Sequence, residues 1–327
     1  MNRQQGLPLL QVLALPIYWL IGRELLDLGL VAASVFMLAA PFAIHTMVVG
    51  IGFIVSYVNQ HEQRGITHSR RRDWLIAYAR EAAVSIRQFY WLMPFREGFA
   101  MPQPVAPVKG PPILLIHGYG CNRGLWLPAA RWFSRRGYRV SAISLHPLHC
   151  PIERYAEAIA EEIARVRGES GAARVALICH SMGGLAARAY LQRCTERAQD
   201  PGLAVLITLG TPHRGTHIAR VGVGENARQM RYGSSWLEQL ASHEALEASA
   251  TAMATYRARI IAVASLQDNI VSRPFEQRLP GRRAILVRRQ GHMSLATSPR
   301  VFRVIERILR RPYAHGSEAG ATGNPLP

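Results

Sequence analysis

The fold of this chain is decided by the stretch Val175-Ala176-Leu177-Ile178-Cys179-His180-Ser181-Met182-Gly183-Gly184. Residues 175–179 are a short apolar run, which predicts a buried strand, and residues 183–194 have the apolar spacing of a helix. Ser181 therefore lies on a tight turn from a strand into a helix. Such a turn raises the serine hydroxyl above the edge of the sheet and directs the positive end of the helix dipole toward it. The stretch predicts that Ser181 is a nucleophile.

Small residues are expected around Ser181, because strand and helix approach each other closely at such a turn. Gly183 and Gly184 meet this expectation on the helix side. On the strand side, Cys179 stands where glycine is usual in the pattern G-x-S-x-G, and cysteine is small enough to fit. The alternative is that Ser181 only caps the helix, which is a common role of serine. Whether Ser181 is a nucleophile or only a helix cap depends on whether a base, an acid and oxyanion donors are also present.

Beyond this stretch, short apolar runs alternate with helical stretches. We expect strands over residues 113–116, 139–145, 203–209, 259–264 and 284–287, and helices over residues 154–166 and 299–309. Continuous apolar strands that alternate with helices imply an α/β fold, with a mostly parallel sheet covered by helices on both faces. Residues 215–257 interrupt this alternation and are predicted to form a helical cap over the site. The α/β domain then extends over residues 111–312.

A nucleophilic serine needs a base to accept its proton and a carboxylate to orient that base. The only aspartates after Ser181 are Asp200 and Asp268. Asp200 precedes a predicted strand and belongs to the other edge of the sheet, whereas Asp268 follows a strand at the catalytic edge. The only histidines after Asp268 are His292, which follows the last strand, and His315, which falls in the predicted tail. By elimination, we expect a triad of Ser181, His292 and Asp268.

Acyl transfer also needs hydrogen-bond donors for the oxyanion that develops in the transition state. The backbone N–H of Met182 directly follows the nucleophile and is the first expected donor. The second is expected in the loop after the first strand, His117-Gly118-Tyr119-Gly120, where glycines let the backbone curl toward the substrate. We assign this second donor to the backbone N–H of Tyr119.

These segments resemble bacterial lipases and esterases of the α/β-hydrolase superfamily. The resemblance covers residues 111–309, and its further elements are Thr208-Leu209-Gly210-Thr211-Pro212-His213-Arg214-Gly215-Thr216, Asp268-Asn269-Ile270-Val271 and Gly291-His292. It implies the α/β-hydrolase fold, the chain order serine, acid, histidine, and ester substrates with lipid-like acyl chains. His213 is expected either to support the pocket wall or to be a plain loop residue. No cofactor is implied, and no metal is expected, because no acidic cluster could hold the calcium found in some lipases.

The N-terminal region is strongly apolar. Residues 28–58 contain no formally charged residue, and residues 7–21 are apolar apart from Gln11 and two prolines. As one helix, residues 28–58 would be about 45 Å long. The hydrocarbon core of a bilayer is about 30 Å thick, so this helix must tilt, bend at Pro41 or form a re-entrant hairpin. We expect residues 1–62 to be a membrane anchor of one or two hydrophobic helices, rather than a soluble core helix or a cleaved signal peptide.

The segment after the anchor indicates its orientation. Arginines at positions 64 and 70–72 follow the apolar run directly. By the positive-inside rule, this flank and the hydrolase domain belong on the cytoplasmic side of the bacterial inner membrane. Residues 63–110 are expected to connect the two, with an amphipathic helix over residues 73–88 and a proline-rich linker from residue 101. That helix is expected either at the membrane surface or packed on the catalytic domain. Residues 313–327 are expected to be a disordered tail.

Charge and cysteine content argue against other classes of protein. The formal net charge is +18, and Lys109 is the only lysine. Since the basic residues are scattered and accompany no recognition module, no nucleic-acid partner is expected. The four cysteines, at positions 121, 150, 179 and 194, form no C-x-x-C pair, which argues against a zinc or redox motif. A pairing of Cys121 with Cys150 stays open, although free thiols in a reducing compartment are favoured.

The expected function is that of a membrane-anchored serine hydrolase, which cleaves carboxylic ester bonds of lipid-like substrates through an acyl-enzyme. The same triad serves thioesterases, amidases and acyltransferases, and the fold does not choose among them. Epoxide hydrolases and dehalogenases are disfavoured, because those families have aspartate where Ser181 stands. The alternative of a different class is a non-catalytic, membrane-tethered binding protein on a hydrolase fold. Such proteins typically lose a triad member, and all three are present here. The sequence indicates no protein partner and no oligomeric state.

Overall fold

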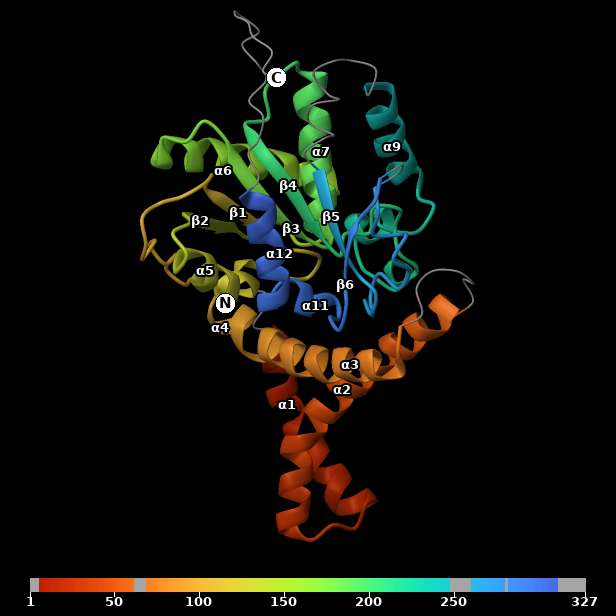
Figure 1. Cartoon of the computed structure of the whole chain (residues 1–327). Coiled ribbons are helices and arrows are strands. Elements are labelled where there is room, and N and C mark those ends of the chain that lie inside the picture. Colours follow the sequence, from red (N-terminus) through yellow and green to blue (C-terminus); the bar gives the residue numbers. More distant parts are fainter. Residues whose placement is uncertain (1–5, 62–68, 248–259, 280–281, 311–327) are drawn as a thin grey trace, which may run out of the picture.

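The computed structural model describes residues 6–61, 69–247, 260–279 and 282–310. In this part of the chain a six-stranded sheet forms the centre, with the order β2-β1-β3-β4-β5-β6 and every neighbouring pair parallel (Figure 1). The strands are β1 (Ile113–Ile116), β2 (Val140–Ile143), β3 (Val175–His180), β4 (Leu203–Leu209), β5 (Ile260–Ser265) and β6 (Ile285–Val287). The predicted parallel α/β sheet is confirmed, and β1 and β4 have the predicted bounds.

Helices cover both faces of this sheet (Figure 1). The helices are α5 (Leu127–Ser134) and α12 (Pro299–Leu309) on one face, and α6 (Tyr155–Ser170) and α7 (Met182–Glu196) on the other. Side chains alternate along a strand, so Leu114 and Ile116 of β1 join the core under α6 and α7, whereas Ile113 and Leu115 join the core under α5 and α12. Helix α5 was not predicted, because eight residues are too few to establish a helical period.

The N-terminal helices form a hairpin. Helix α1 (Gly6–Leu20) continues into a π-helical turn (Ile21–Leu25), and α2 (Leu30–His61) returns toward the domain. Pro41 lies inside α2, which continues through it as one helix. Figure 1 shows α1 and the first part of α2 projecting from the domain as a stalk. Within the described residues, one helix, over Leu30–Gln60 with a mean hydropathy of 2.0, is long and apolar enough to cross a membrane.

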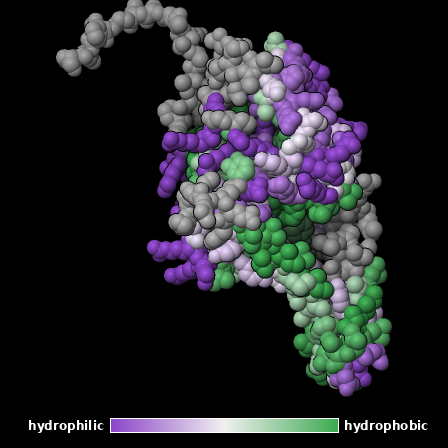
Figure 2. Space-filling view, turned by 90° about the vertical axis from the view of Figure 1, so that its right-hand side faces the viewer, coloured by the Kyte–Doolittle hydropathy of each residue, from purple (hydrophilic) through white to green (hydrophobic). Residues whose placement is uncertain are grey.

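The apolar surface of the stalk continues toward the domain. Figure 2 shows apolar residues over much of the projecting hairpin and on the adjoining part of the domain, whereas the far end of the domain is mainly hydrophilic. Side chains such as Val31, Val35 and Leu38 of α2 are more than half exposed. Large contiguous apolar surfaces on a protein mark contact with a partner or a membrane.

The predicted connector helix packs on the catalytic domain. It is α3 (Arg71–Arg87), followed by a π-helical turn (Gln88–Leu92) and the short α4 (Met93–Phe95). Helix α3 lies across the base of the domain, between α2 and the short helix α11 (His292–Leu295) (Figure 1). Of the two positions expected for this helix, the structure shows the one on the domain. Residues 101–112 follow without helix or strand.

The described part of the insertion between β4 and β5 contains three short helical segments joined by turns. It contains a 3-10 turn (His217–Arg220), α8 (Glu225–Gln229) and α9 (Ser235–Glu247). The remainder of the predicted cap, residues 248–257, and the predicted tail, residues 313–327, lie outside the described residues.

Candidate active site

Ser181 occupies a strained turn between β3 and α7. Its φ of 54° is positive, in a region that non-glycine residues rarely adopt at a cost of about 1–3 kcal/mol. The turn is held from both sides: the backbone N–H of Ser181 donates to the carbonyl of Leu209 at 2.9 Å, and the hydroxyl of Thr211 donates to the carbonyl of Ser181 at 2.9 Å. A plain helix cap is extended and needs no such strain. The geometry is that of a nucleophile turn.

The glycine after this turn is required by close packing. A Cβ on Gly183 would lie 2.5 Å from the carbonyl oxygen of His117, which is closer than real Cβ contacts come. Since that carbonyl belongs to the loop after β1, the small residue lets α7 approach the loop that faces Ser181. The close approach expected from the sequence is present on the helix side.

Asp268 and His292 meet at the carboxyl edge of the sheet. Nδ1 of His292 lies 3.0 Å from Oδ1 and 2.9 Å from Oδ2 of Asp268. Both side chains are buried, and Oδ1 of Asp268 also accepts the backbone N–H groups of Ile270 and Val271 at 2.9 and 2.8 Å. These bonds fix the carboxylate and leave the other ring nitrogen of His292 available. Asp200, by contrast, pairs with Arg174 at the opposite edge.

The electrostatics around His292 favour its charged form. Burial opposes the imidazolium, but the charge and hydrogen bond of Asp268, together with the charge of Glu81, outweigh burial and raise the pKa of His292. The neighbouring His180 behaves in the opposite way, because burial and the charge of His292 hold its pKa well below the usual range. The neutral His180 donates from Nε2 to the carbonyl of His292 at 3.0 Å. It therefore steadies the backbone of the candidate base.

The two expected oxyanion donors flank Ser181. Met182 begins α7 directly after Ser181, and the loop that contains Tyr119 lies against Ser181: a Cβ on Gly118 would lie 2.7 Å from Cβ of Ser181. In residues 6–61, 69–247, 260–279 and 282–310, no hydrogen bond joins the backbone N–H of Tyr119 or Met182 to a protein acceptor. Both donors are thus available for an oxyanion. The Tyr119 hydroxyl accepts the N–H of Val223 at 2.9 Å, which links this loop to the cap.

Ser181 and His292 open into one cavity of about 480 Å³. Ligand cavities commonly measure about 300–1,000 Å³. Its wall is mainly apolar and comes from three parts of the chain: the sheet domain, the cap (Ile218, Val221, Met230) and the N-terminal helices (Val48, Val49, Phe89). The contribution of the N-terminal helices was not expected from the sequence.

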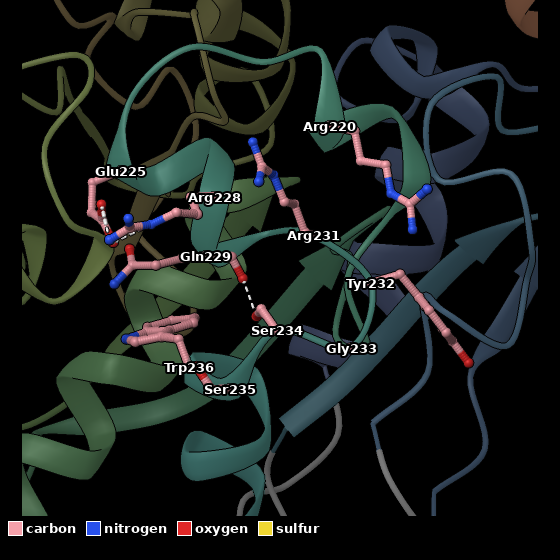
Figure 3. A pocket seen from close by; sticks show the side chains of 10 residues that line it. All are labelled: Arg220, Glu225, Arg228, Gln229, Arg231, Tyr232, Gly233, Ser234, Ser235 and Trp236. Carbon is pink, nitrogen blue, oxygen red and sulfur yellow. Dashed lines mark hydrogen bonds and ion pairs between the residues drawn. The ribbon is translucent and has the colours of Figure 1, made fainter.

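A second, larger cavity of about 660 Å³ lies on the cap and is polar. Figure 3 shows its side chains, among them Arg220, Arg231 and Tyr232, with Arg228 paired to Glu225. None of the three triad candidates lines this cavity. We therefore place the candidate site in the smaller, apolar one.

Helix α2 is bonded to the loop that carries Asp268. The hydroxyl of Ser56 donates to the carbonyl of Asp268 at 2.5 Å and to that of Ser272 at 3.1 Å, and the amide of Gln60 donates to the carbonyl of Leu266 at 2.8 Å. A Cβ on Gly52 would lie 2.9 Å from the carbonyl oxygen of Asn269. The predicted membrane helix therefore supports the acid of the site.

Helix α3 is bonded to the loop that carries His292. The carboxylate of Glu81 accepts the backbone N–H groups of Met293 and Ser294 at 2.6 and 2.9 Å, and the hydroxyl of Ser294 at 2.6 Å. The sequence reasoning missed Glu81, although a signal existed: it lies on the same helical face as Trp74, Ala77 and Ser85, where an acid is unusual.

His213 is buried but is not among the residues that line the cavity in the described part of the chain. Its Nε2 lies 2.9 Å from the hydroxyl of Thr208, and its carbonyl accepts Nη1 of Arg188 at 3.2 Å. Arg188 is fully buried and forms a two-pronged ion pair with Glu244 of α9, at 2.8 and 3.0 Å. His213 is thus part of the link between α7, the loop after β4 and the cap. Sequence spacing gave no indication of the ion pair.

In the described part of the chain the four cysteines form no disulfide, and Cys121 lines the candidate cavity. All four are buried, and burial raises the pKa of the Cys121 thiol to about 12. A thiol with such a pKa stays protonated at neutral pH and is a poor nucleophile.

Comparisons with known proteins agree with this architecture. Residues 112–268 match the model of the palmitoyl protein thioesterase family. The mature form of the Bacillus licheniformis lipase BlEst2 is similar in structure, with 19% identity and a TM-score of 0.53, over 64% of this chain and 97% of that one. The propeptide form of that lipase is also similar, with 19% identity and a TM-score of 0.52, over 68% of this chain and 55% of that one. No curated protein sequence matches this chain.

At this level of identity, the structural matches establish the fold. The matched region, residues 112–268, includes the nucleophile turn, the loop after β1 and Asp268. Together with the parallel sheet, these findings show that the chain has the α/β-hydrolase fold and is similar to a lipase and to the palmitoyl protein thioesterase family model.

Proposed function

We propose that the protein is a serine hydrolase that cleaves ester or thioester bonds of long-chain acyl groups. The observation that carries the proposal is that Ser181, on its strained turn, shares one apolar cavity with His292, whose ring lies within hydrogen-bond distance of Asp268. A non-catalytic binding protein would have no need for a strained serine beside a buried base and acid.

In this proposal, Oγ of Ser181 attacks the acyl carbonyl carbon while His292 takes the hydroxyl proton. The backbone N–H groups of Tyr119 and Met182 stabilise the oxyanion. Collapse of the tetrahedral intermediate breaks the bond to the leaving alcohol or thiol, which receives the proton from His292. Water then attacks the acyl-enzyme with His292 again as the base, and the carboxylic acid is released. Asp268 holds the ring and stabilises its cationic form throughout.

Two classes of bond fit the site. The ester is favoured by the sequence elements shared with lipases, and the thioester is favoured by the match of residues 112–268 to the palmitoyl protein thioesterase model. The apolar cavity wall supports an acyl chain in either case. We propose the ester as the main substrate class and the thioester as the second candidate.

We further propose that the hairpin holds this site at a bilayer, with the domain on the cytoplasmic side of the bacterial inner membrane. Support comes from the exposed apolar length of α1 and α2 and from the arginines at positions 70–72. Residues 30–44 of α2, which precede the first cavity-lining residue His45, measure about 22 Å as a helix. That is shorter than the hydrocarbon core of about 30 Å, so a hairpin that enters and returns on one side fits better than a full span.

The test is labelling with a fluorophosphonate probe, combined with a substrate series. Purified full-length protein should react with the probe, and the Ser181→Ala variant should not. Rates should then be compared on p-nitrophenyl esters from acetate to palmitate and on a palmitoyl thioester. We expect higher kcat/KM with long chains than with acetate. Absence of labelling on folded protein would contradict the proposal. A rate on the thioester above the rate on every ester would make the thioester the main substrate class and the ester the second candidate.

A further inference from the structure

Glu81 is a buried carboxylate that the proposed mechanism does not use. It comes from α3, outside the sheet domain, and is 1% exposed. It also lines the same cavity as Ser181 and His292. Burying a carboxylate costs several kcal/mol unless hydrogen bonds or charges compensate. Its partners therefore indicate what it does.

Every hydrogen bond to Glu81 comes from the two residues after His292. Oε1 accepts the N–H of Met293, and Oε2 accepts both the N–H and the hydroxyl of Ser294. Three donors on two carboxylate oxygens suit an ionised group, which only accepts. Burial still raises the pKa of Glu81, and these hydrogen bonds and the charge of His292 oppose that rise.

The residue before His292 is adapted to this carboxylate. A Cβ on Gly291 would lie 2.4 Å from the carboxyl carbon of Glu81, so no larger residue fits without displacing the acid. The backbone on both sides of His292 is thus in contact with one side chain of α3. The ring of His292 is meanwhile oriented by Asp268, and its carbonyl is bonded by His180.

We propose that Glu81 is a positioning residue of the active site, which holds the backbone of His292 in place and adds a second negative charge beside the imidazolium formed during catalysis. This inference rests on the proposed serine hydrolase mechanism. The charged or titratable groups that face His292 are then Asp268 from the loop after β5, His180 from β3, and Glu81 from α3. The catalytic base is held between the sheet domain and the N-terminal region.

The test compares two isosteric variants on the same helix. Glu81→Gln removes the charge beside His292. Asp73→Asn removes a buried charge of α3 that bonds Nε of Arg289, three residues before His292, at 2.6 Å; in the described part of the chain Asp73 bonds neither Met293 nor Ser294. The second variant controls for the docking of α3. The measurement is kcat/KM as a function of pH, with fluorophosphonate labelling and a melting curve for each protein.

The expected result follows from the sign of the interaction. The negative charge of Glu81 raises the pKa of His292, so its removal lowers that pKa and moves the acid limb of the profile to lower pH. We expect a shift of about one pH unit and a fall in the plateau of kcat/KM of about tenfold. Asp73→Asn should leave the acid limb in place and keep kcat/KM within about threefold of the wild type.

A further variant keeps the inference testable if Glu81→Gln does not fold. Glu81→Asp keeps the charge but shortens the reach to Met293 and Ser294, so it should lower kcat and leave the acid limb where it is. An unchanged kcat in Glu81→Asp, an unmoved acid limb in folded Glu81→Gln, or an equal shift in Asp73→Asn would overturn the inference. If wild-type protein is not labelled by the probe, the proposed function itself fails. If it is labelled and Glu81→Gln equals it in every measurement, only this inference fails.

Discussion

The sheet domain and the N-terminal helices contribute to the same cavity, but their sequences reveal this to very different degrees. In the sheet domain, Ser181, Asp268 and His292 each follow a strand, so their shared edge can be derived from the order of strands. In the N-terminal helices, the pattern indicates only hydropathy and helical period. Yet α2 and α3 place Ser56 and Glu81 against the loops of the acid and the base. The lesson is that a segment with the composition of an anchor can also form part of the wall of the candidate site.

Helix α2 itself has one half that projects from the domain and one half that contacts the candidate site. Its first half, residues 30–44, packs against α1 and is otherwise largely exposed. From His45 onward, one face of the helix lines the cavity or bonds the loop of Asp268, while Ile51, Ile54 and Val55 on the other face stay at least half exposed. The second half of α2 thus lies between the domain and, in our proposal, the bilayer. Four changes test how far the two regions depend on each other.

The largest effect is expected from Asp268→Asn, in the sheet domain. Loss of the carboxylate removes the partner that orients His292 and favours its charged form, so kcat should fall by about 10³–10⁴-fold. The assay is hydrolysis of a p-nitrophenyl ester. Asp200→Asn is the matched control at the opposite edge of the sheet, where the side chain is 54% exposed, and it should leave kcat unchanged. Equal losses in the two variants would show that the acid is wrongly assigned.

The next largest effect is expected from removing residues 1–58. This deletion takes away Ser56 and the cavity wall from α2, and a displaced catalytic loop can cost about a hundredfold in rate. We expect the loss on short-chain and long-chain esters alike. Removing only residues 1–29 keeps α2, and in detergent it should preserve the rate on short-chain esters. If the longer deletion were fully active on both, the N-terminal helices would be a tether and nothing more.

A smaller effect is expected from Gly52→Ala, which tests the contact between α2 and the loop of Asp268. The added methyl would lie 2.9 Å from the carbonyl oxygen of Asn269, and such overpacking costs about 1–3 kcal/mol. Gly50→Ala on the same helix meets only Tyr78 at 3.5 Å, and should be neutral or stabilising by up to about 1 kcal/mol. Melting temperatures in detergent measure both. A more stable Gly52→Ala variant would mean that α2 does not pack on this loop.

The smallest effect is expected from Ser56→Ala. It removes one hydroxyl that donates to the carbonyls of Asp268 and Ser272, and the loss should be about 1 kcal/mol of stability. The loop retains the bonds from Gln60, so kcat should fall only slightly. Ser34→Ala, in the exposed half of α2, should change neither quantity. A large loss of kcat in Ser56→Ala would indicate that this single bond, rather than the helix, holds the acid.

Much of the sheet domain could be predicted from the sequence because its information is local. Apolar runs identified the strands, and their alternation with helices indicated a parallel sheet with both faces covered. The turn at Ser181 was visible from the small residues around it. Even so, the 3-10 turns and the short helix α5 were missed, since a few residues carry no measurable period.

The partners of the site came only from tertiary structure. Hydropathy alone indicated an apolar anchor in residues 28–58 but could not indicate that one face of its second half would line the cavity and bond the loop of Asp268. The amphipathic pattern of α3 was consistent with a position at the membrane surface and with one on the catalytic domain. Such a pattern indicates which face of a helix is buried but not what packs against that face. The order of residues along the chain thus indicated Ser181, Asp268 and His292 as the candidate triad. What holds the acid and the base in place was decided by contacts such as Ser56 with Asp268 and Glu81 with Ser294, more than two hundred residues apart, which no local pattern encodes.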